Sequence, residues 1–229
     1  YGKTTDLTAM GGAQYVHTFD KCFFMPSDLT AGLEYNRDRL KDNMWGYDRH
    51  TDQTVNIYSA FLQNEWKNDR WGILIGGRLD KHNMVDNVIF SPRANLRFNP
   101  TQNINLRLSY SSGFRAPQAF DEDMHIENVG GTVAMIERAK NLKEEKSQSF
   151  SASADMYHRF GVFQTNFLIE GFYTRLTDVF VLGEPYDRGD GILVKTRSNG
   201  PGAKVMGLTL EGKVAYLSIL QIQAGLTLQ

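Results

Sequence analysis

The sequence predicts an all-β protein, an antiparallel up-and-down transmembrane β-barrel fragment of about ten strands. Three observations support this fold class. Apolar and polar residues alternate along most of the chain, long and short connections alternate between these segments, and aromatic residues gather beside the short connections. No segment has the apolar spacing that would make a long helix the better interpretation.

The alternation defines the strands. In segment 28–36 the apolar residues stand at odd positions from Leu29 to Tyr35, and in segment 104–111 they stand at even positions from Ile104 to Tyr110. A period of two places all of these apolar side chains on one face of a strand. The same pattern predicts strands at 8–19, 28–41, 54–66, 71–82, 89–99, 104–114, 148–158, 163–182, 196–216 and 220–229.

The connections fall into two classes that alternate along the chain. In an up-and-down sheet every second connection lies at the same end, so the long ones share one end and the tight turns share the other. Outer-membrane barrels have this asymmetry, with short periplasmic turns and long extracellular loops. The short class comprises 67–70, 100–103, 159–162 and 217–219, with 20–27 somewhat longer; the long class comprises 42–53, 115–147 and 183–195, with 83–88 the shortest of its class.

Aromatic residues flank the tight turns: Trp66, Trp71, Phe98, Phe160 and Phe163. A belt of this kind is typical of a membrane interface. Aromatic residues near strand ends also cap the core of a soluble barrel or sandwich, which therefore stays open as an alternative. The loop asymmetry favours the membrane barrel.

Composition excludes several classes. The chain has 229 residues and no evident linker, and its formal net charge of -1 argues against nucleic acid as a partner. No apolar run approaches the roughly 18 residues of a membrane-spanning helix. The first residues lack the pattern of a secretory signal, so we expect a piece of a longer precursor. Cys22 is the only cysteine, so no internal disulfide is expected.

The stretch 110–131, YSSGFRAPQAFDEDMHIENVGG, interrupts the alternation for longer than any other. Pro117 breaks the strand pattern, because proline cannot donate to a ladder and biases Ala116 away from helix. Alternation resumes at Ser149. A connection of roughly 30 residues is usually functional or mobile. Within it, 132–145 is expected to hold at most a short helix.

These residues resemble a known family. The strings GFRAPQAFDEDMHI, NVGG and NLKEEKSQSFSASADMY look like the barrel of a TonB-dependent outer-membrane receptor, in which a G-[FY]-[RK]-A-P step enters a surface loop and N-L-K-P-E-[KT]-S opens the next strand. Glu144 stands where that motif usually has proline. The strings GLEY, GGRLDKH, FSPRANLRF, GFYTRLTDVF and GLTLEG fit the family in order, so the resemblance covers essentially the whole chain.

The resemblance implies a function and partners. Such a receptor binds a scarce solute, for example a ferric siderophore, haem or cobalamin, at its outer surface and imports it with energy relayed through TonB. The family barrel has about 22 strands and an N-terminal plug. Residues 1–229 are therefore expected to be part of one barrel domain in the bacterial outer membrane, in contact with its lipid, with the plug and the TonB-contacting box outside this chain.

Two rivals remain. A passive porin or structural barrel would have no plug, and an outer-membrane barrel enzyme would need acid, base and nucleophile at the loop end. No catalytic motif is present, and Cys22 with His17 nearby is more often incidental than a nucleophile and its base. We expect neither enzymatic activity nor a resident metal or cofactor.

The ligand candidates lie in the long loop. Its carboxylates suit hard cations, but consecutive residues in a loop rarely converge on one ion, and a solvated acidic loop is the simpler interpretation. Two partners are open for the loop's arginine: an anionic ligand, or the first aspartate of the loop across its base. Arginine suits bidentate contacts with a carboxylate, and the motif recurs in the family that the chain resembles, so we favour the structural pair. The candidates are Arg115, Asp121, Glu122, Asp123 and His125, with Glu127 beside them.

Overall fold

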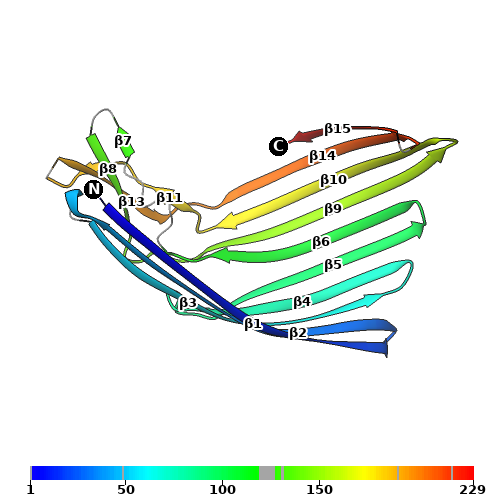
Figure 1. Ribbon diagram of the computed structural model, residues 1–229, viewed down its shortest axis with the longest axis horizontal. Helices are drawn as coiled ribbons and strands as arrows, with labels where there is room; N and C mark the ends of the chain where they lie inside the picture. The colour runs from blue at the N-terminus through cyan, green and yellow to red at the C-terminus, as the bar shows by residue number, and fades with distance from the viewer. Residues whose placement is uncertain (1, 48, 119–126, 130–131, 190, 218) are drawn as a thin grey trace.

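The structure is a computed structural model that describes residues 2–47, 49–118, 127–129, 132–189, 191–217 and 219–229. Ten long strands form one antiparallel sheet, in which β1 and β15 are the two edges (Figure 1). Every predicted strand contributes to this sheet, which confirms the all-β antiparallel fold class. The strands are β1 (Gly2–Cys22), β2 (Met25–Met44), β3 (Arg49–Lys67), β4 (Trp71–His82), β5 (Ile89–Thr101), β6 (Ile104–Arg115), β9 (Glu145–Phe160), β10 (Phe163–Thr177), β14 (Ala203–Tyr216) and β15 (Leu220–Leu228).

A second, smaller sheet was not anticipated. It has the order β11-β13-β8-β7, with β12 paired to β13, and only the β13–β8 pairing is parallel. The predicted strands 163–182 and 196–216 each divide, because their loop-end parts join this sheet. Its members are β7 (Glu127–Val129), β8 (Thr132–Arg138), β11 (Phe180–Leu182), β12 (Tyr186–Asp187) and β13 (Ile192–Asn199).

The expectation of a short helix within 132–145 is wrong. Residues Thr132–Arg138 form β8, whose ladder with β13 runs from Val133 opposite Ile192 to Arg138 opposite Arg197. Here a distant partner strand satisfies the backbone hydrogen bonds that a helix would have satisfied locally. In the described ranges, no helix is long and apolar enough to cross a membrane. The 3-10 helix η1 (Trp45–Tyr47) joins β2 to β3.

The main sheet has one apolar and one polar face, because the strand registers align the alternating residues across neighbouring strands. One lateral row of the apolar face comprises Phe98, Leu106, Ala154, Ile169, Leu210 and Leu226. The adjacent row on the polar face comprises Arg97, Arg107, Ser153, Glu170, Thr209 and Thr227. This is the pattern of a membrane barrel, with apolar residues facing lipid and polar residues facing the lumen.

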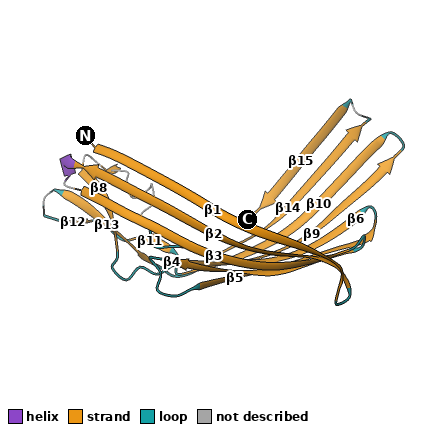
Figure 2. Ribbon diagram, turned by 60° about the horizontal axis from the view of Figure 1, so that its bottom comes forward, coloured by secondary structure: helices purple, strands orange, loops and turns teal. Residues whose placement is uncertain are grey.

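The two ends of the sheet differ as predicted. At one end, the turn end, adjacent strands are joined by tight turns; at the other, the loop end, lie the longer connections and the whole second sheet (Figures 1 and 2). Aromatic pairs stack at the turn end: the rings of Trp71 and Phe98 are 4.2 Å apart, and those of Phe24 and Trp66 are 5.8 Å apart.

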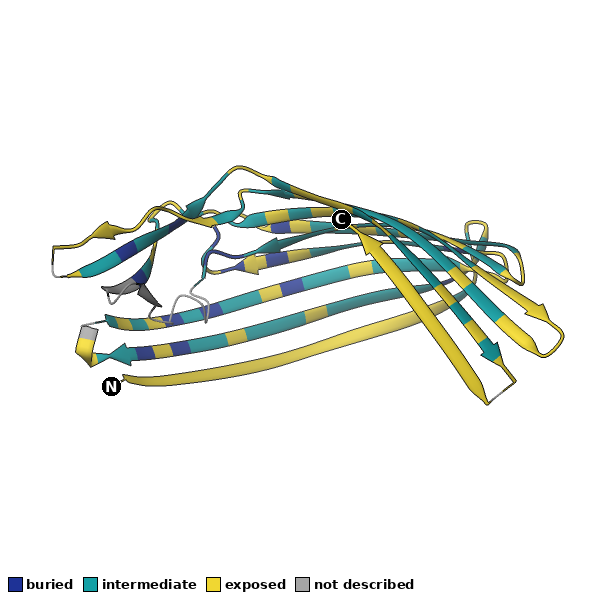
Figure 3. Cartoon of the chain, turned by 90° about the horizontal axis from the view of Figure 1, so that it is seen from above, coloured by how far each residue is buried: buried dark blue, intermediate teal, exposed yellow. Residues whose placement is uncertain are grey.

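The buried residues concentrate at the loop end, on the polar face of the main sheet. Leu40, Val55 and His82 point from β2, β3 and β4 to this face and are at most 6% exposed. Val194, on β13 of the second sheet, is completely buried. Figure 3 shows the same distribution, with buried residues in the loop-end portions of the strands and β1 exposed along its length. The polar face is therefore covered at the loop end, where Arg138 of the second sheet reaches Gln53 of β3 and Val85, Ile89 and Ala116 form a buried cluster, and it is largely open at the turn end.

Candidate ligand-binding site

Of the candidates Arg115, Asp121, Glu122, Asp123 and His125, Arg115 lies within the described ranges, at the end of β6, and Glu127, named beside them, begins β7. The guanidinium carbon of Arg115 is 5.6 Å from the centre of the Phe180 ring on β11, within the range of a cation–π contact. Arg115 thus joins the main sheet to the second sheet. Its predicted pairing with Asp121 lies outside the described residues, as do the other ligand candidates, Glu122, Asp123 and His125.

The motif NLKEEKS at 141–147, which leads into β9, has a structural role at the loop end. Asn199 accepts a hydrogen bond from the backbone N–H of Lys143 at 2.8 Å and donates to the carbonyls of Lys143 at 3.0 Å and Asp178 at 2.7 Å. Glu145 accepts a hydrogen bond from the N–H of Phe180 at 2.9 Å. These contacts hold the ends of β11 and β13 against the start of β9.

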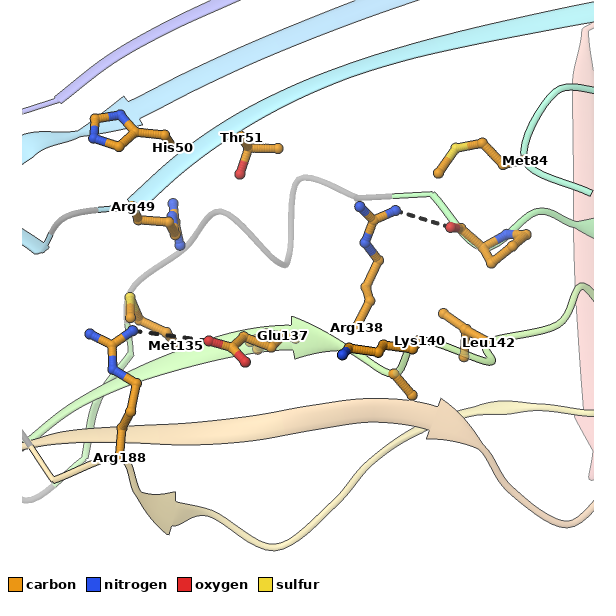
Figure 4. A pocket seen from close by; sticks show the side chains of 13 residues that line it. Arg49, His50, Thr51, Met84, Met135, Glu137, Arg138, Lys140, Leu142 and Arg188 are labelled. Atoms are coloured by element: carbon orange, nitrogen blue, oxygen red, sulfur yellow. Dashed lines mark hydrogen bonds and ion pairs between the residues drawn. The ribbon is translucent and has the colours of Figure 1, made fainter.

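A cavity of about 650 Å³ lies between the loop end of β3 and the second sheet (Figure 4). Five parts of the chain contribute to its lining: the start of β3, the connection after β4, the residues after β6, the end of β8 with the residues after it, and the connection from β12 to β13. It is lined by Arg49, His50, Thr51, Met84, Pro117, Met135, Ile136, Glu137, Arg138, Ala139, Lys140, Leu142 and Arg188.

The cavity lining is predominantly basic. Among the lining residues that the structure describes, Arg49, Arg138, Lys140 and Arg188 contribute four cations and Glu137 contributes the one carboxylate. Arg188 Nη1 lies 4.0 Å from Glu137 Oε1, at the limit of an ion pair. Cations therefore outnumber carboxylates among the described lining residues, which favours an anionic ligand.

Hydrogen bonds and an ion pair position two of these arginines. Arg138 donates to the side-chain oxygen of Gln53 at 2.9 Å and to the carbonyl of Pro117 at 3.1 Å. Arg49 forms an ion pair with Asp42 at 2.7 Å, and Asp42, which is 1% exposed, also accepts a hydrogen bond from Thr4 at 2.6 Å. The guanidinium groups are thus held in place before any ligand arrives.

The basic residues of the cavity were missed from the sequence. They stand at positions 49, 138, 140 and 188, and no local motif connects them. The only sequence signal was the pair Arg138 and Lys140 within the long connection, which the acidic cluster nearby obscured. Among the residues that the structure describes, no group of histidine, cysteine, aspartate and glutamate side chains could hold a metal ion.

Comparisons with known proteins agree on the fold. The family model for the TonB dependent receptor-like β-barrel matches residues 1–229. The siderophore receptor PirA from Pseudomonas aeruginosa superposes with a TM-score of 0.76 at 16% identity, over 99% of this chain and 43% of that one. A mutant of the ferric enterobactin receptor PfeA from Pseudomonas aeruginosa, in complex with enterobactin, superposes with a TM-score of 0.73 at 19% identity. The match covers 99% of this chain and 36% of that one.

A third solved structure extends this comparison to another organism. The FrpB iron transporter from Neisseria meningitidis gives a TM-score of 0.71 at 16% identity, over 98% of this chain and 36% of that one. The chain thus spans less than half the length of these structures. No curated protein sequence matches the chain.

Proposed function

Because the chain belongs to the TonB-dependent receptor-like β-barrel family, we propose that its protein imports an anionic ferric siderophore across the bacterial outer membrane. The family and the structural neighbours are transport receptors and not enzymes. In this proposal residues 1–229 form part of the barrel wall, and a plug and a TonB-contacting segment elsewhere in the protein supply gating and energy.

The basic cavity at the loop end is the observation that carries this proposal. The four cations and one carboxylate among its described lining residues suit a ferric complex with net negative charge, as a catecholate siderophore has. Cobalamin, which has no comparable negative charge, fits this lining less well. PirA and PfeA, named as a siderophore receptor and a ferric enterobactin receptor, support the same substrate class.

The test is ligand binding by the full-length protein, wild type and variants. We expect saturable binding of a ferric catecholate siderophore, weakened at least about tenfold in the double variant Lys140→Glu, Arg188→Glu, because charge-assisted contacts contribute about 1.5–3 kcal/mol each. Lys21→Glu, a charge reversal at the exposed turn end, is the control and should bind like wild type. Alanine variants of Arg115, Asp121, Glu122, Asp123 and His125 test the predicted loop contacts separately.

Two outcomes would contradict the proposal. Preferential binding of cobalamin, with no effect of the two charge reversals, would remove the basic cavity from the binding site. Unsaturable entry of all solutes into cells, independent of cellular energy, would favour the passive porin.

A further inference from the structure

The apolar face of β1–β4 changes character at a pair of tyrosines. Tyr35 on β2 lies opposite Tyr58 on β3, and their rings are 4.9 Å apart. Toward the turn end the next residues on this face are apolar, with Leu33 opposite Ala60. Toward the loop end the next residues of β2 on this face are charged (Arg37, Arg39 and Lys41), and those of β3 opposite them are polar or charged (Asn56, Thr54 and Asp52). A tyrosine pair at such a boundary is typical of the interface between a membrane and water.

A basic patch lies on the loop-end side of this boundary. Its members are Lys3 on β1, Arg37, Arg39 and Lys41 on β2, and Lys81 on β4. All five lie on the same face as the tyrosine pair. Lys81 lies directly opposite Tyr58, and the other four follow from the alternation along β1 and β2, whose pairing is uninterrupted here. The intervening residue Asp42 contacts Thr4 on the other face, as the alternation requires.

Few carboxylates balance the basic patch. On the loop-end side of the tyrosine pair, Asp52 is the only carboxylate that the described β1–β4 place on this face. It lies 3.1 Å from Lys41 and 3.7 Å from Arg39. Its hydrogen bond with Lys41 lowers the pKa of Asp52 below its usual value. Within the described chain, neither Arg37 nor Lys3 has a carboxylate at ion-pair distance. The patch therefore keeps a net positive charge facing outward.

An apolar groove of about 560 Å³ lies directly beside the patch, on the same face. Gly11 and Ala13 of β1, Leu33 of β2 and Leu79 of β4 line it, and Lys81 lies at its rim. The groove is open at Gly11, where an added Cβ would meet no heavy atom within 4 Å.

We propose that the basic patch and this groove form a binding site for a phosphate-bearing lipid of the leaflet at the loop end. The lipid phosphates lie against Arg37, Lys41 and their neighbours, and an acyl chain lies in the groove between Gly11 and Leu79. Basic residues just beyond the apolar band attract anionic headgroups and are tolerated there, whereas they are costly at mid-membrane depth. The site rests on the proposed membrane position of the barrel and is separate from the solute cavity.

The test is native mass spectrometry of the full-length protein in nanodiscs that contain diphosphoryl lipid A, phosphatidylglycerol or phosphatidylcholine. We expect retention of lipid A and, more weakly, of phosphatidylglycerol. The double variant Arg37→Gln, Lys41→Gln should bind lipid A about 25-fold more weakly, because each cation near a membrane surface contributes roughly a factor of five. The control, Lys21→Gln with Arg159→Gln, removes two exposed cations at the turn end and should bind like wild type.

A second pair of variants tests the groove without changing charge. Gly11→Leu should fill the groove and weaken lipid A retention, whereas Gly171→Leu, also in open space on the apolar face but on β10, should not. Equal retention of all lipids, no effect of the double variant, or full competition by inorganic phosphate would overturn the proposal. Ferric siderophore binding should persist in all these variants, so failure of the lipid site and failure of the receptor function are distinguishable.

Discussion

The polar face of the main sheet has two different surroundings at its two ends, although the sequence pattern is the same along it. At the loop end this face is covered, and Asp42, Asp80 and His82 are at most 3% exposed. At the turn end the same face is uncovered, and Arg107 is exposed. The difference shows that alternation assigns a residue to a face, whereas its burial depends on what covers that face.

Two ion pairs on β2 make this comparison measurable. Asp42 at the loop end pairs with Arg49 at 2.7 Å, and the two side chains are 1% and 13% exposed. Asp28 at the turn end pairs with Lys67 at 2.6 Å, and there the side chains are 25% and 52% exposed. The pairs have similar geometry and lie on the same face of the same strand, so they differ mainly in burial.

The largest expected effect is that of Asp42→Ala. Removing one partner of a buried pair should lower the free energy of unfolding by about 3–5 kcal/mol, because the remaining charge is poorly solvated. The measurement is urea unfolding of the refolded protein in detergent, with Asp28→Ala as the matched control. Asp28→Ala should lower the free energy of unfolding much less, since exposed ion pairs contribute little to stability. Equal losses in the two variants would contradict the inference that burial makes the loop-end ion pair the more important of the two.

A smaller effect is expected at the contact between the two sheets. Arg138→Ala removes the hydrogen bonds to Gln53 at 2.9 Å and Pro117 at 3.1 Å. Loss of hydrogen bonds from a charged donor should destabilise the second sheet by about 1.5–3 kcal/mol. Hydrogen exchange should accelerate at β8 and β13 but not at β9 or β10. Unchanged exchange at β8 would show that Arg138 does not hold the second sheet in place.

The smallest effect is expected at the open turn end. Arg97 and Arg107 lie directly opposite each other on β5 and β6. Like charges in this arrangement are unfavourable, so Arg107→Glu should stabilise the sheet by about 0.2–1 kcal/mol, less the lost hydrogen bond to Asn105. The thermal midpoint of the variant should be equal to or slightly above that of wild type. A clear decrease would mean that the polar face at the turn end is more constrained than its exposure indicates.

Much of the main sheet could be predicted from the sequence. Its ten strands, its two faces and the separation of long connections from tight turns all follow from patterns within a few residues or from the order of the chain. The interrupted stretch after Phe114 also placed the predicted ligand contacts at the loop end. The predicted ligand contacts Asp121, Glu122, Asp123 and His125 stay predictions.

The second sheet and the basic cavity could not be predicted in the same way. Strand β8 needed a parallel partner, β13, more than 50 residues away along the chain, and nothing in Thr132–Arg138 specifies that partner. The cavity combines Arg49 with Arg138 and Arg188 only after this pairing has formed.

The sequence by itself determined which side chains share a face, because a strand repeats every two residues whatever its surroundings. Only the tertiary structure decided which part of the polar face is buried and which cations meet in one cavity. Both depend on contacts between distant segments, which local periodicity does not record.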